Sequence, residues 1–567
     1  MLSISLTLAL TLLGQLRPMA GDTVPLYDNL GDHRYGVTTE VPAAQRYFDQ
    51  GLRLYYAFNH AEAIRAFREA QRLDPDCAMC FWGEAIAWGP NINMPMDSAA
   101  GVAGYAAVQR ALALRAGASD RERVLIDALA TRYAPVPPAD RAALDSAYAR
   151  AMADVVRQYP DDHEAAVLYA ESLMDLRPWN YWTADGKLQP GMADAIVQLE
   201  RVMARNPEHP GACHFYIHAV EAAHPERAVA CAERLAGLMP GAGHLVHMPG
   251  HIYVRVGRYM DAVKANEHAV HADESYIRDQ RPGVGIYTAG YYPHNYDFMA
   301  FAAAMAGRSR QAIGAADKLA SLAAARMTDA PDMAFLQHHA TRALQLRTRF
   351  GRWDEILRAP APRAEFLHAR AMWHYARGRA LAAQGRVEEA DAELSRVHAA
   401  ATDPRLAGVK LEFNESHAIL GVAEHVLAGK IAAARGDHEQ AVAQLREAAA
   451  MEDSLTYGEP PDWTVPVRQE LGAVLLAADR PREAEQVYRE ELKRFPRNGW
   501  SLAGLARALH AQERHTEAAR VEAELRQAWS SADVPLPMSN TREEARSSDP
   551  DSPASGEIAS TGAFFRP

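Results

Sequence analysis

Histidines recur at helical spacing in the middle of the chain. The stretch from Gly243 to Tyr253 reads GHLVHMPGHIY and places His244, His247 and His251 three and four residues apart. If this stretch is helical, all three imidazoles lie on one face. Imidazole is the commonest metal ligand of proteins, and two imidazoles four residues apart form an efficient chelate. The spacing predicts a metal-binding segment, in which Pro249 either starts a helix or bends one.

Two further stretches carry side chains of the same kind. His214 and His218 lie four residues apart in CHFYIHAVEAAH, which also holds Glu221, and His294 lies in YYPHNYD. Carboxylates beside such histidines can bind a metal directly or orient the imidazoles. The candidate metal ligands are His214, His218, His244, His247, His251 and His294. The carboxylates expected to support them or to line the same surface are Glu171, Asp175, Glu221 and Asp297.

A period of about 34 residues organises the elements around these stretches. Residues 44–77 carry small residues where two helices would cross, aromatic residues and a terminal proline, namely Tyr47, Gly51, Ala63, Phe67, Ala70 and Pro75. The same places are taken near the C-terminus by Gly472, Ala484, Tyr488 and Pro496. This pattern resembles the tetratricopeptide repeat (TPR), in particular that of exported bacterial proteins. The resemblance implies an all-α fold, a right-handed α-solenoid of about twelve TPR-like helical pairs with inserted loops.

The resemblance also implies which side chains face the concave groove. In TPR proteins the groove is lined mainly from the second, fifth, ninth, twelfth and thirteenth places of each unit. Units started three residues after Pro207 and after Pro240 put the five histidines of the first two stretches at such places. The four carboxylates and the last histidine also fall there: Glu171, Asp175, Glu221, His294 and Asp297. Because packed helices lie about 8–10 Å apart, these side chains can meet at one ion or a close pair of ions.

Six histidines are more than one tetrahedral ion needs. The sequence therefore favours two nearby divalent transition-metal ions, or one ion with spare histidines, and copper, iron and zinc all accept imidazole. In spacing, the two HxxxH pairs are similar to those of dinuclear copper oxygen-binding proteins. A single groove histidine is more often a hydrogen-bonded core residue than a metal ligand. Histidines placed without selection would, however, scatter over all faces of the helices, whereas these six share the face that lines the groove.

Composition limits the remaining possibilities. The net charge of −12 and the pI near 6.0 argue against a partner that is nucleic acid or an anionic membrane, because both need basic patches. An apolar run from Leu2 to Leu13 predicts a signal peptide, and hence a periplasmic or secreted protein, although no positive charge precedes the run. About 12 apolar residues are too few for a stable membrane span.

Four cysteines remain, at positions 77, 80, 213 and 231. In an exported chain they predict two local disulfides, Cys77 with Cys80 and Cys213 with Cys231, with buried free thiols as the alternative. A redox motif or half of a zinc site is less favoured for CAMC, since no second CxxC completes a four-thiolate site.

Four loops interrupt the repeat and are rich in aromatic, Asn, Gly and Pro residues: 90–96, 176–190, 277–292 and 451–463. Their aromatic rings either wall a pocket over the histidines or plug spaces between helices. The expected organisation is a signal peptide at 1–20, N-terminal repeats at 44–158, central histidine-rich repeats at 163–325, C-terminal repeats at 332–529 and a disordered tail at 531–567.

Three functions fit these patterns. The first is a metal centre in the groove that binds a small molecule or peptide and can transform it by oxidation or hydrolysis. The second is a scaffold without catalysis that binds a protein or peptide partner, and the third is a periplasmic metal-binding protein. The distinctive residues concentrate between 163 and 297, which favours the first, but the sequence does not decide whether the protein is an enzyme.

Overall fold

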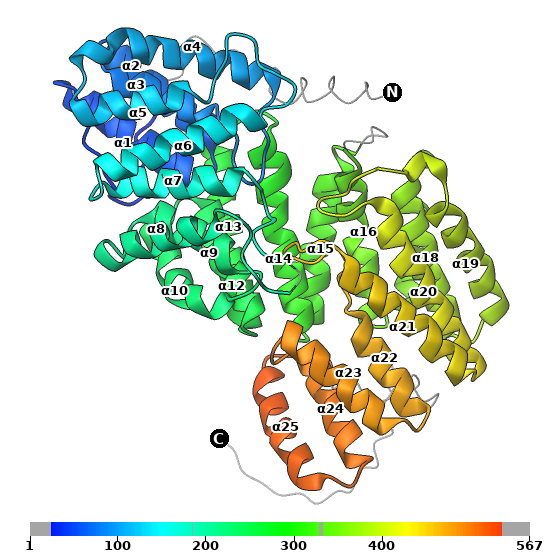
Figure 1. Cartoon of the computed structure of the whole chain (residues 1–567). Helices are drawn as coiled ribbons and strands as arrows, with labels where there is room; N and C mark the ends of the chain where they lie inside the picture. The colour runs from blue at the N-terminus through cyan, green and yellow to red at the C-terminus, as the bar shows by residue number, and fades with distance from the viewer. Residues whose placement is uncertain (1–23, 184, 328–332, 536–567) are drawn as a thin grey trace, which may run out of the picture.

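A computed structural model describes residues 24–183, 185–327 and 333–535 (Figure 1). The expected signal peptide at 1–20 lies outside these residues, as does most of the expected tail. In the described part of the chain, no helix has both the length and the apolar character that a membrane crossing requires.

Consecutive helices pack against each other in pairs. The first six pairs are α1 (Pro42–Tyr56) with α2 (His60–Leu73), α3 (Ala78–Ala87) with α4 (Ser98–Leu114), α5 (Asp120–Ala130) with α6 (Ala142–Gln158), α7 (His163–Asp175) with α8 (Met192–Arg205), α9 (Pro210–Val220) with α10 (Val229–Leu238), and the divided helix α11 (Gly243–His247) and α12 (Pro249–Arg255) with α13 (Tyr259–Gln280). The next six are α14 (Tyr292–Met305) with α15 (Ser309–Ala324), α16 (Ala334–Arg349) with α17 (Trp353–Arg358), α18 (Leu367–Ala383) with α19 (Val387–Ala401), α20 (Ser416–Arg435) with α21 (His438–Ser454), α22 (Val467–Ala477) with α23 (Pro481–Arg494), and α24 (Gly499–His510) with α25 (His515–Ala528). The predicted all-α array of TPR-like helical pairs is confirmed.

Small residues let these helices approach closely. A Cβ atom at Gly51 of α1 would lie 2.7 Å from the Phe67 ring of α2, closer than real side-chain contacts allow. Gly83 of α3 packs on the same ring. The glycine of the repeat is therefore required by the packing of the aromatic residue at its helix crossing.

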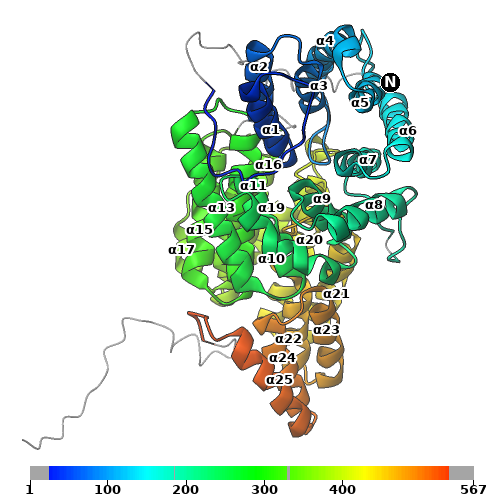
Figure 2. The same cartoon turned by 90° about the vertical axis from the view of Figure 1, so that its left-hand side faces the viewer.

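The array bends back on itself, so that its C-terminal repeats touch its middle (Figures 1 and 2). The Tyr259 hydroxyl of α13 donates to the Pro496 carbonyl at 2.9 Å, and the Trp500 indole N–H donates to the Ala304 carbonyl at 2.9 Å. Phe495 joins the buried core of the central helices. The C-terminal repeats therefore pack against the start of α13 and the end of α14.

Pro249 divides the histidine-bearing helix into two. Proline has no N–H to continue the hydrogen-bond ladder, so α11 ends at His247 and α12 begins at Pro249, in the first turn, where proline is tolerated. Met248 between them keeps a right-handed helical backbone, and the His251 N–H donates to its carbonyl at 3.2 Å. The two short helices thus follow one path with a local change in pitch.

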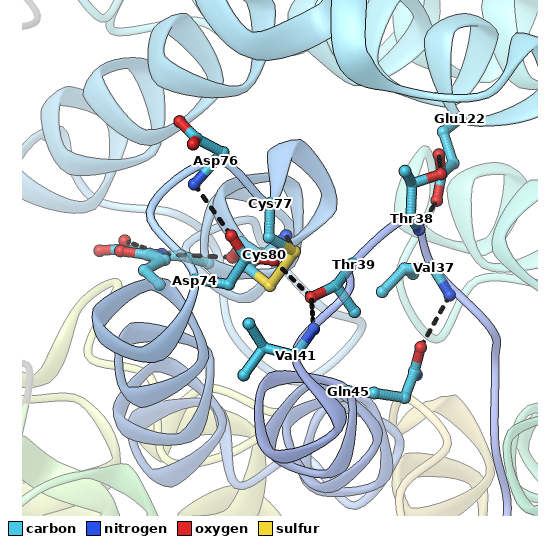
Figure 3. Close-up of a disulfide and its surroundings, with 12 residues drawn as sticks. Val37, Thr38, Thr39, Val41, Gln45, Asp74, Asp76, Cys77, Cys80 and Glu122 are labelled. Carbon is cyan, nitrogen blue, oxygen red and sulfur yellow. Dashed lines mark hydrogen bonds between the residues drawn. A yellow bond between two sulfur atoms is a disulfide. The ribbon is translucent and has the colours of Figure 1, made fainter.

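The two expected cysteine pairs differ. Cys77 and Cys80 are joined by a disulfide at the start of α3, beside the segment 37–41 (Figure 3). The backbone N–H of Val41 donates to the Thr39 hydroxyl at 3.1 Å, and the Thr39 hydroxyl in turn donates to Asp74. Cys213 and Cys231 are free and buried.

Candidate metal centre

The six predicted ligands gather in two groups of three. His214 and His218 of α9 meet His244 of α11. The second group consists of His247 at the end of α11, His251 of α12 and His294 of α14. Each group has one ligand nitrogen per residue within 4.8 Å of the others. The structure thus brings together all six histidines, from the first helices of three successive repeats.

The nitrogen separations suit metal coordination. The Nε2 atoms of His214 and His244 lie 3.2 Å apart, and those of His247 and His251 lie 2.9 Å apart. Ligand nitrogens at about 2.0–2.1 Å from a tetrahedral ion are separated by about 3.3 Å. Small side-chain adjustments would therefore let each group surround one ion.

The other ring nitrogen of four histidines is held by an oxygen acceptor. Nδ1 of His214 donates to the Tyr56 carbonyl at 2.7 Å, which is free because Tyr56 is the last residue of α1. Nδ1 of His218 donates to Oε1 of Glu221 at 2.9 Å, and Nδ1 of His251 donates to Oε2 of the same carboxylate at 2.6 Å. Each Nδ1 therefore carries the proton and leaves Nε2 with a lone pair for a metal.

His247 is oriented in the same way by Asn266 of α13. The Asn266 amide nitrogen donates to the Ala262 carbonyl at 2.9 Å, which fixes the amide so that its oxygen faces Nδ1 of His247 at 2.9 Å. The lone pairs of His247 and His251 then point at each other across 2.9 Å. Two lone pairs repel unless a cation lies between them, so this gap must hold either an extra proton or a metal ion.

Burial keeps most of these imidazoles neutral. Desolvation, reinforced by the neighbouring histidines, holds the pKa values of His214, His244 and His247 well below 6.5 and lowers the pKa of His294 to about 3. Desolvation also lowers the pKa of His218. Neutral imidazole is the form that binds metal ions.

Glu221 links the two groups. Burial alone would raise the pKa of its carboxyl, but His251 and His218 more than offset this and hold the pKa at about 2. The carboxylate is fully buried and places one negative charge among the six histidine rings. It is engaged by two Nδ1 atoms, so it supports the ligands and is not itself free to be one.

Each group is covered by one phenylalanine. The Phe58 ring lies 4.5 Å from His214 and 5.2 Å from His244, and the Phe298 ring lies 4.7 Å from His247 and 4.5 Å from His251, between ring centroids. These rings exclude water and hold the imidazole planes. His294 is half-buried whereas the other five histidines are almost completely buried, so the centre is most open on its side.

All four interrupting loops come close to the centre or to its supports. Asn93 of the first accepts a hydrogen bond from the Trp179 indole of the second at 3.0 Å, and Trp179 packs edge-on to His218 at 5.1 Å. Tyr291 of the third packs on His244 at 4.7 Å. Glu459 of the fourth lies 3.8 Å from Arg255, which donates to the backbone carbonyl of Glu221.

Three predicted carboxylates have other partners. Glu171 accepts from the Tyr55 hydroxyl, and Asp175 pairs with Arg132 at 2.5 Å, in a separate buried cluster on α7. Burial and the neighbouring Asp175 raise the pKa of Glu171 to about 8. Asp297 accepts two hydrogen bonds from the Arg342 guanidinium, at 3.0 and 3.1 Å. Among the four, only Glu221 touches the histidines through hydrogen bonds recorded in the described residues.

Two other clusters contain metal-binding residue types but have different chemistry. His33, Glu164 and His209 meet beside a cavity of about 660 Å³. Nδ1 of His209 accepts from the Ala212 N–H at 3.2 Å, so its Nε2, which lies 3.2 Å from Oε1 of Glu164, carries the proton. In the cluster of Asp297, His339 and Glu412, the Arg342 guanidinium already occupies the cation position beside Asp297.

Sequence reasoning did not identify four residues of the centre: Tyr56, Phe58, Asn266 and Phe298. Phe298 lies one helical turn after His294, so helical spacing could have found it. Asn266 faces the divided helix from α13, where a Cβ at Gly250 would lie 2.8 Å from its amide nitrogen. Tyr56 and Phe58 come from the first repeat, far away in sequence.

Comparisons with known proteins add little. No family model matches the sequence, and no curated protein matches it. Among solved structures, the human IFIT1 dimer with PPP-AAAA has a TM-score of 0.31 at 12% identity and covers 86% of this chain and 92% of that chain. Yeast Tom70 has a TM-score of 0.28 at 12% identity, with 85% and 90% covered. Likenesses this weak carry no functional argument, and the architecture is assigned from the helical pairs of the chain itself.

Proposed function

We propose that the protein binds two copper ions, one in each group of three histidines, and uses them to oxidise a small molecule with dioxygen. The observation that carries this proposal is the pair of inward-facing Nε2 lone pairs on His247 and His251, each fixed by a hydrogen bond at the opposite nitrogen. The same arrangement of a supported Nδ1 and a free Nε2 recurs at His214 and His218 in the other group.

The donor set favours copper. All six candidate ligands are imidazoles, and the one nearby carboxylate, Glu221, is engaged with the ligands. Carboxylate-poor imidazole sites suit copper and zinc better than manganese, magnesium or calcium, and copper binds most strongly in the divalent series. Two divalent ions would bring four positive charges to a buried site with one negative charge, whereas two Cu(I) ions bring two. The buried neutral ligands therefore favour the lower oxidation state of copper.

The charge imbalance also suggests the reaction class. Dioxygen becomes an anion as it takes up electrons, and so supplies negative charge that the ligands lack. Two Cu(I) ions can give two electrons to one dioxygen molecule. A substrate that loses two electrons and two protons then restores Cu(I), and the sum is the dehydrogenated substrate and hydrogen peroxide. The open side near His294 is where a small substrate would approach.

The proposal is tested by loading the metal-free protein with Cu(I) without oxygen and then admitting dioxygen. We expect two copper ions in the histidine centre of each chain, uptake of one dioxygen per two of these ions, and little electron paramagnetic resonance signal, because the two oxidised ions couple. The His247→Ala variant should hold about one copper and show an ordinary isolated Cu(II) signal. His398→Ala, a change at an exposed histidine, is the matched control. Tight zinc binding with no copper retention would contradict the proposal.

The groove geometry is less suited to a peptide scaffold at this point. Five of the six histidines are almost completely buried, and aromatic rings cover both groups. An extended peptide would have to displace Trp179 and Phe413, whose rings meet at 5.2 Å across the groove. Binding of a partner elsewhere on the array is compatible with the copper centre.

A further inference from the structure

Three sulfur atoms from three successive helices meet behind the histidine centre. Sγ of Cys213 on α9 lies 2.8 Å from Sγ of Cys231 on α10, and Sγ of Cys231 lies 3.1 Å from Sδ of Met203 on α8. Both cysteines are buried, whereas Met203 is half-buried and reaches the surface. Cys213 directly precedes His214, which contributes to the first group of histidines.

This contact is not ordinary packing. Methionine and free cysteine usually behave as soft apolar residues whose sulfur atoms pack against carbon and aromatic rings. Here three polarisable atoms face one another within hydrogen-bond distance, although neither thiol is a strong donor. The close approach is relieved by bonding: through a shared proton, a sulfur–sulfur bond, or a cation held by all three.

We propose that Met203, Cys213 and Cys231 form a Cu(I) site that holds copper for the six-histidine centre. Two thiolates and a thioether are soft donors, and soft donors select Cu(I) over harder divalent ions. The thioether is the informative member, because structural zinc sites are built from thiolate, imidazole and carboxylate and do not use methionine. The sulfur atoms would move apart to admit the ion, which the flexible Met203 side chain allows.

The position suits capture from solvent. Met203 is half-buried and gives the cluster access to solvent, while His214 and His218 lie on a different face of α9 from Cys213. Residues 213 and 214 point about 100° apart on the helix. An ion held by the sulfur atoms is thus one residue along the chain from the first group of ligands. The role in copper loading rests on the proposed function, but the affinity of the sulfur site for Cu(I) does not.

The first test measures Cu(I) binding in competition with bicinchoninate, without oxygen and with a reductant that is not a thiol. It uses the His218→Ala/His244→Ala/His247→Ala/His251→Ala background, in which each group of histidines has lost two of its three ligands. We expect one tightly bound Cu(I) per chain with sulfur neighbours in X-ray absorption. The further change Cys213→Ser/Cys231→Ser should abolish this binding, and Met203→Leu should weaken it by at least about tenfold.

The matched control is Cys77→Ser/Cys80→Ser, which removes the other cysteine pair and should leave the tight site intact. Binding that survives Cys213→Ser/Cys231→Ser would overturn the proposal. So would a thiol count showing that Cys213 and Cys231 are linked in the purified protein and do not bind Cu(I) after reduction.

The second test follows copper transfer in the protein with all six histidines intact. Cys213→Ser/Cys231→Ser should slow the loading of the histidine centre from dilute Cu(I) and leave the final copper content of that centre unchanged. Equal loading rates in the native protein and in Cys213→Ser/Cys231→Ser would contradict the proposal that the sulfur site captures copper for the histidine centre. If the sulfur site binds Cu(I) while the histidine centre takes up no copper in any variant, the proposed function fails and the sulfur site stands.

Discussion

Nε2 of His247 and Nε2 of His251 lie 2.9 Å apart, while Nδ1 of each ring already donates to an oxygen atom. One turn of helix separates the two residues, and the break at Pro249 lies between them. Neither ring can turn away without losing its hydrogen bond to Asn266 or Glu221. The pair is therefore held in a geometry that is unfavourable when empty and favourable around a cation.

Metal removal should destabilise the protein. A ligand that binds only the folded state adds about 2.7 kcal/mol at a concentration one hundred times its dissociation constant. We expect a strong chelator to lower the melting temperature, and re-addition of copper to restore it. Scanning calorimetry with and without chelator measures the effect. A His247→Ala/His251→Ala variant should respond far less, and an equal response in that variant would mean that the metal binds elsewhere.

Glu221→Gln should weaken both groups of histidines together. The amide can accept from only one Nδ1–H, and its NH₂ group faces the other Nδ1–H, donor against donor. Loss of such a supporting group typically costs 10–100-fold in metal affinity, so we expect a loss of about that size. Competition with a chromophoric chelator measures it. Glu171→Gln, a buried carboxylate on α7, is the matched control and should leave copper affinity unchanged.

Gly250→Ala should disturb the centre without touching a histidine. The new Cβ would lie 2.8 Å from the Asn266 amide nitrogen and 3.5 Å from the Phe298 ring. Asn266 must move, and His247 then loses its orienting acceptor. Overpacking of this kind costs about 1–3 kcal/mol. We expect a lower melting temperature together with weaker metal binding. Gly314→Ala, at a position with open space, should change neither.

The stabilisation from the contact between His33, which precedes α1, and Glu164 of α7 should depend on pH. His33 lies 2.7 Å from Glu164, and although burial acts against its charge, the carboxylate raises its pKa above 6.5. A raised pKa means that the stabilisation is fully present below pH 6.5 and is lost as pH rises through the folded-state pKa. The difference in melting temperature between the native protein and His33→Gln should therefore shrink from about pH 6 to about pH 9.

A double-mutant cycle separates this pair from other effects of pH. In a Glu164→Gln background, His33→Gln should have little further effect at any pH, because the charge partner is gone. A difference that stays constant with pH in the native background would show that His33 acts by packing alone.

Repeat spacing predicted much of the centre because it depends on helical phase alone. Once Pro207 and Pro240 set the register, His214, His218 and Glu221 had to share a face with the next three histidines. Glu171 and Asp175 also fall at groove positions, but their recorded polar partners are local ones, the Tyr55 hydroxyl and the Arg132 guanidinium. The repeat register predicts which way a side chain points, and the buried groups nearest to it determine its hydrogen-bond or charge partner.

Contacts across long sequence separations could not be predicted in this way. The Tyr56 carbonyl reaches His214 across 158 positions only because α1 ends with an unpaired carbonyl beside α9. Trp179 meets Phe413 because the array bends back on itself. No local pattern encodes that bend, which depends on the summed angles between successive repeats.

The bend has a further consequence for how the chain folds and evolves. In an open solenoid each repeat touches only its neighbours, so units can be gained or lost with a roughly additive effect. Here hydrogen bonds of Tyr259 and Trp500 join the last repeats to the middle, so we expect repeats far apart in sequence to unfold together. Insertion or deletion of a repeat between them would shift the C-terminal repeats relative to α13 and α14 and break these contacts. We therefore expect the number of repeats between α13 and α24 to be constrained, as the identity of a buried core residue is.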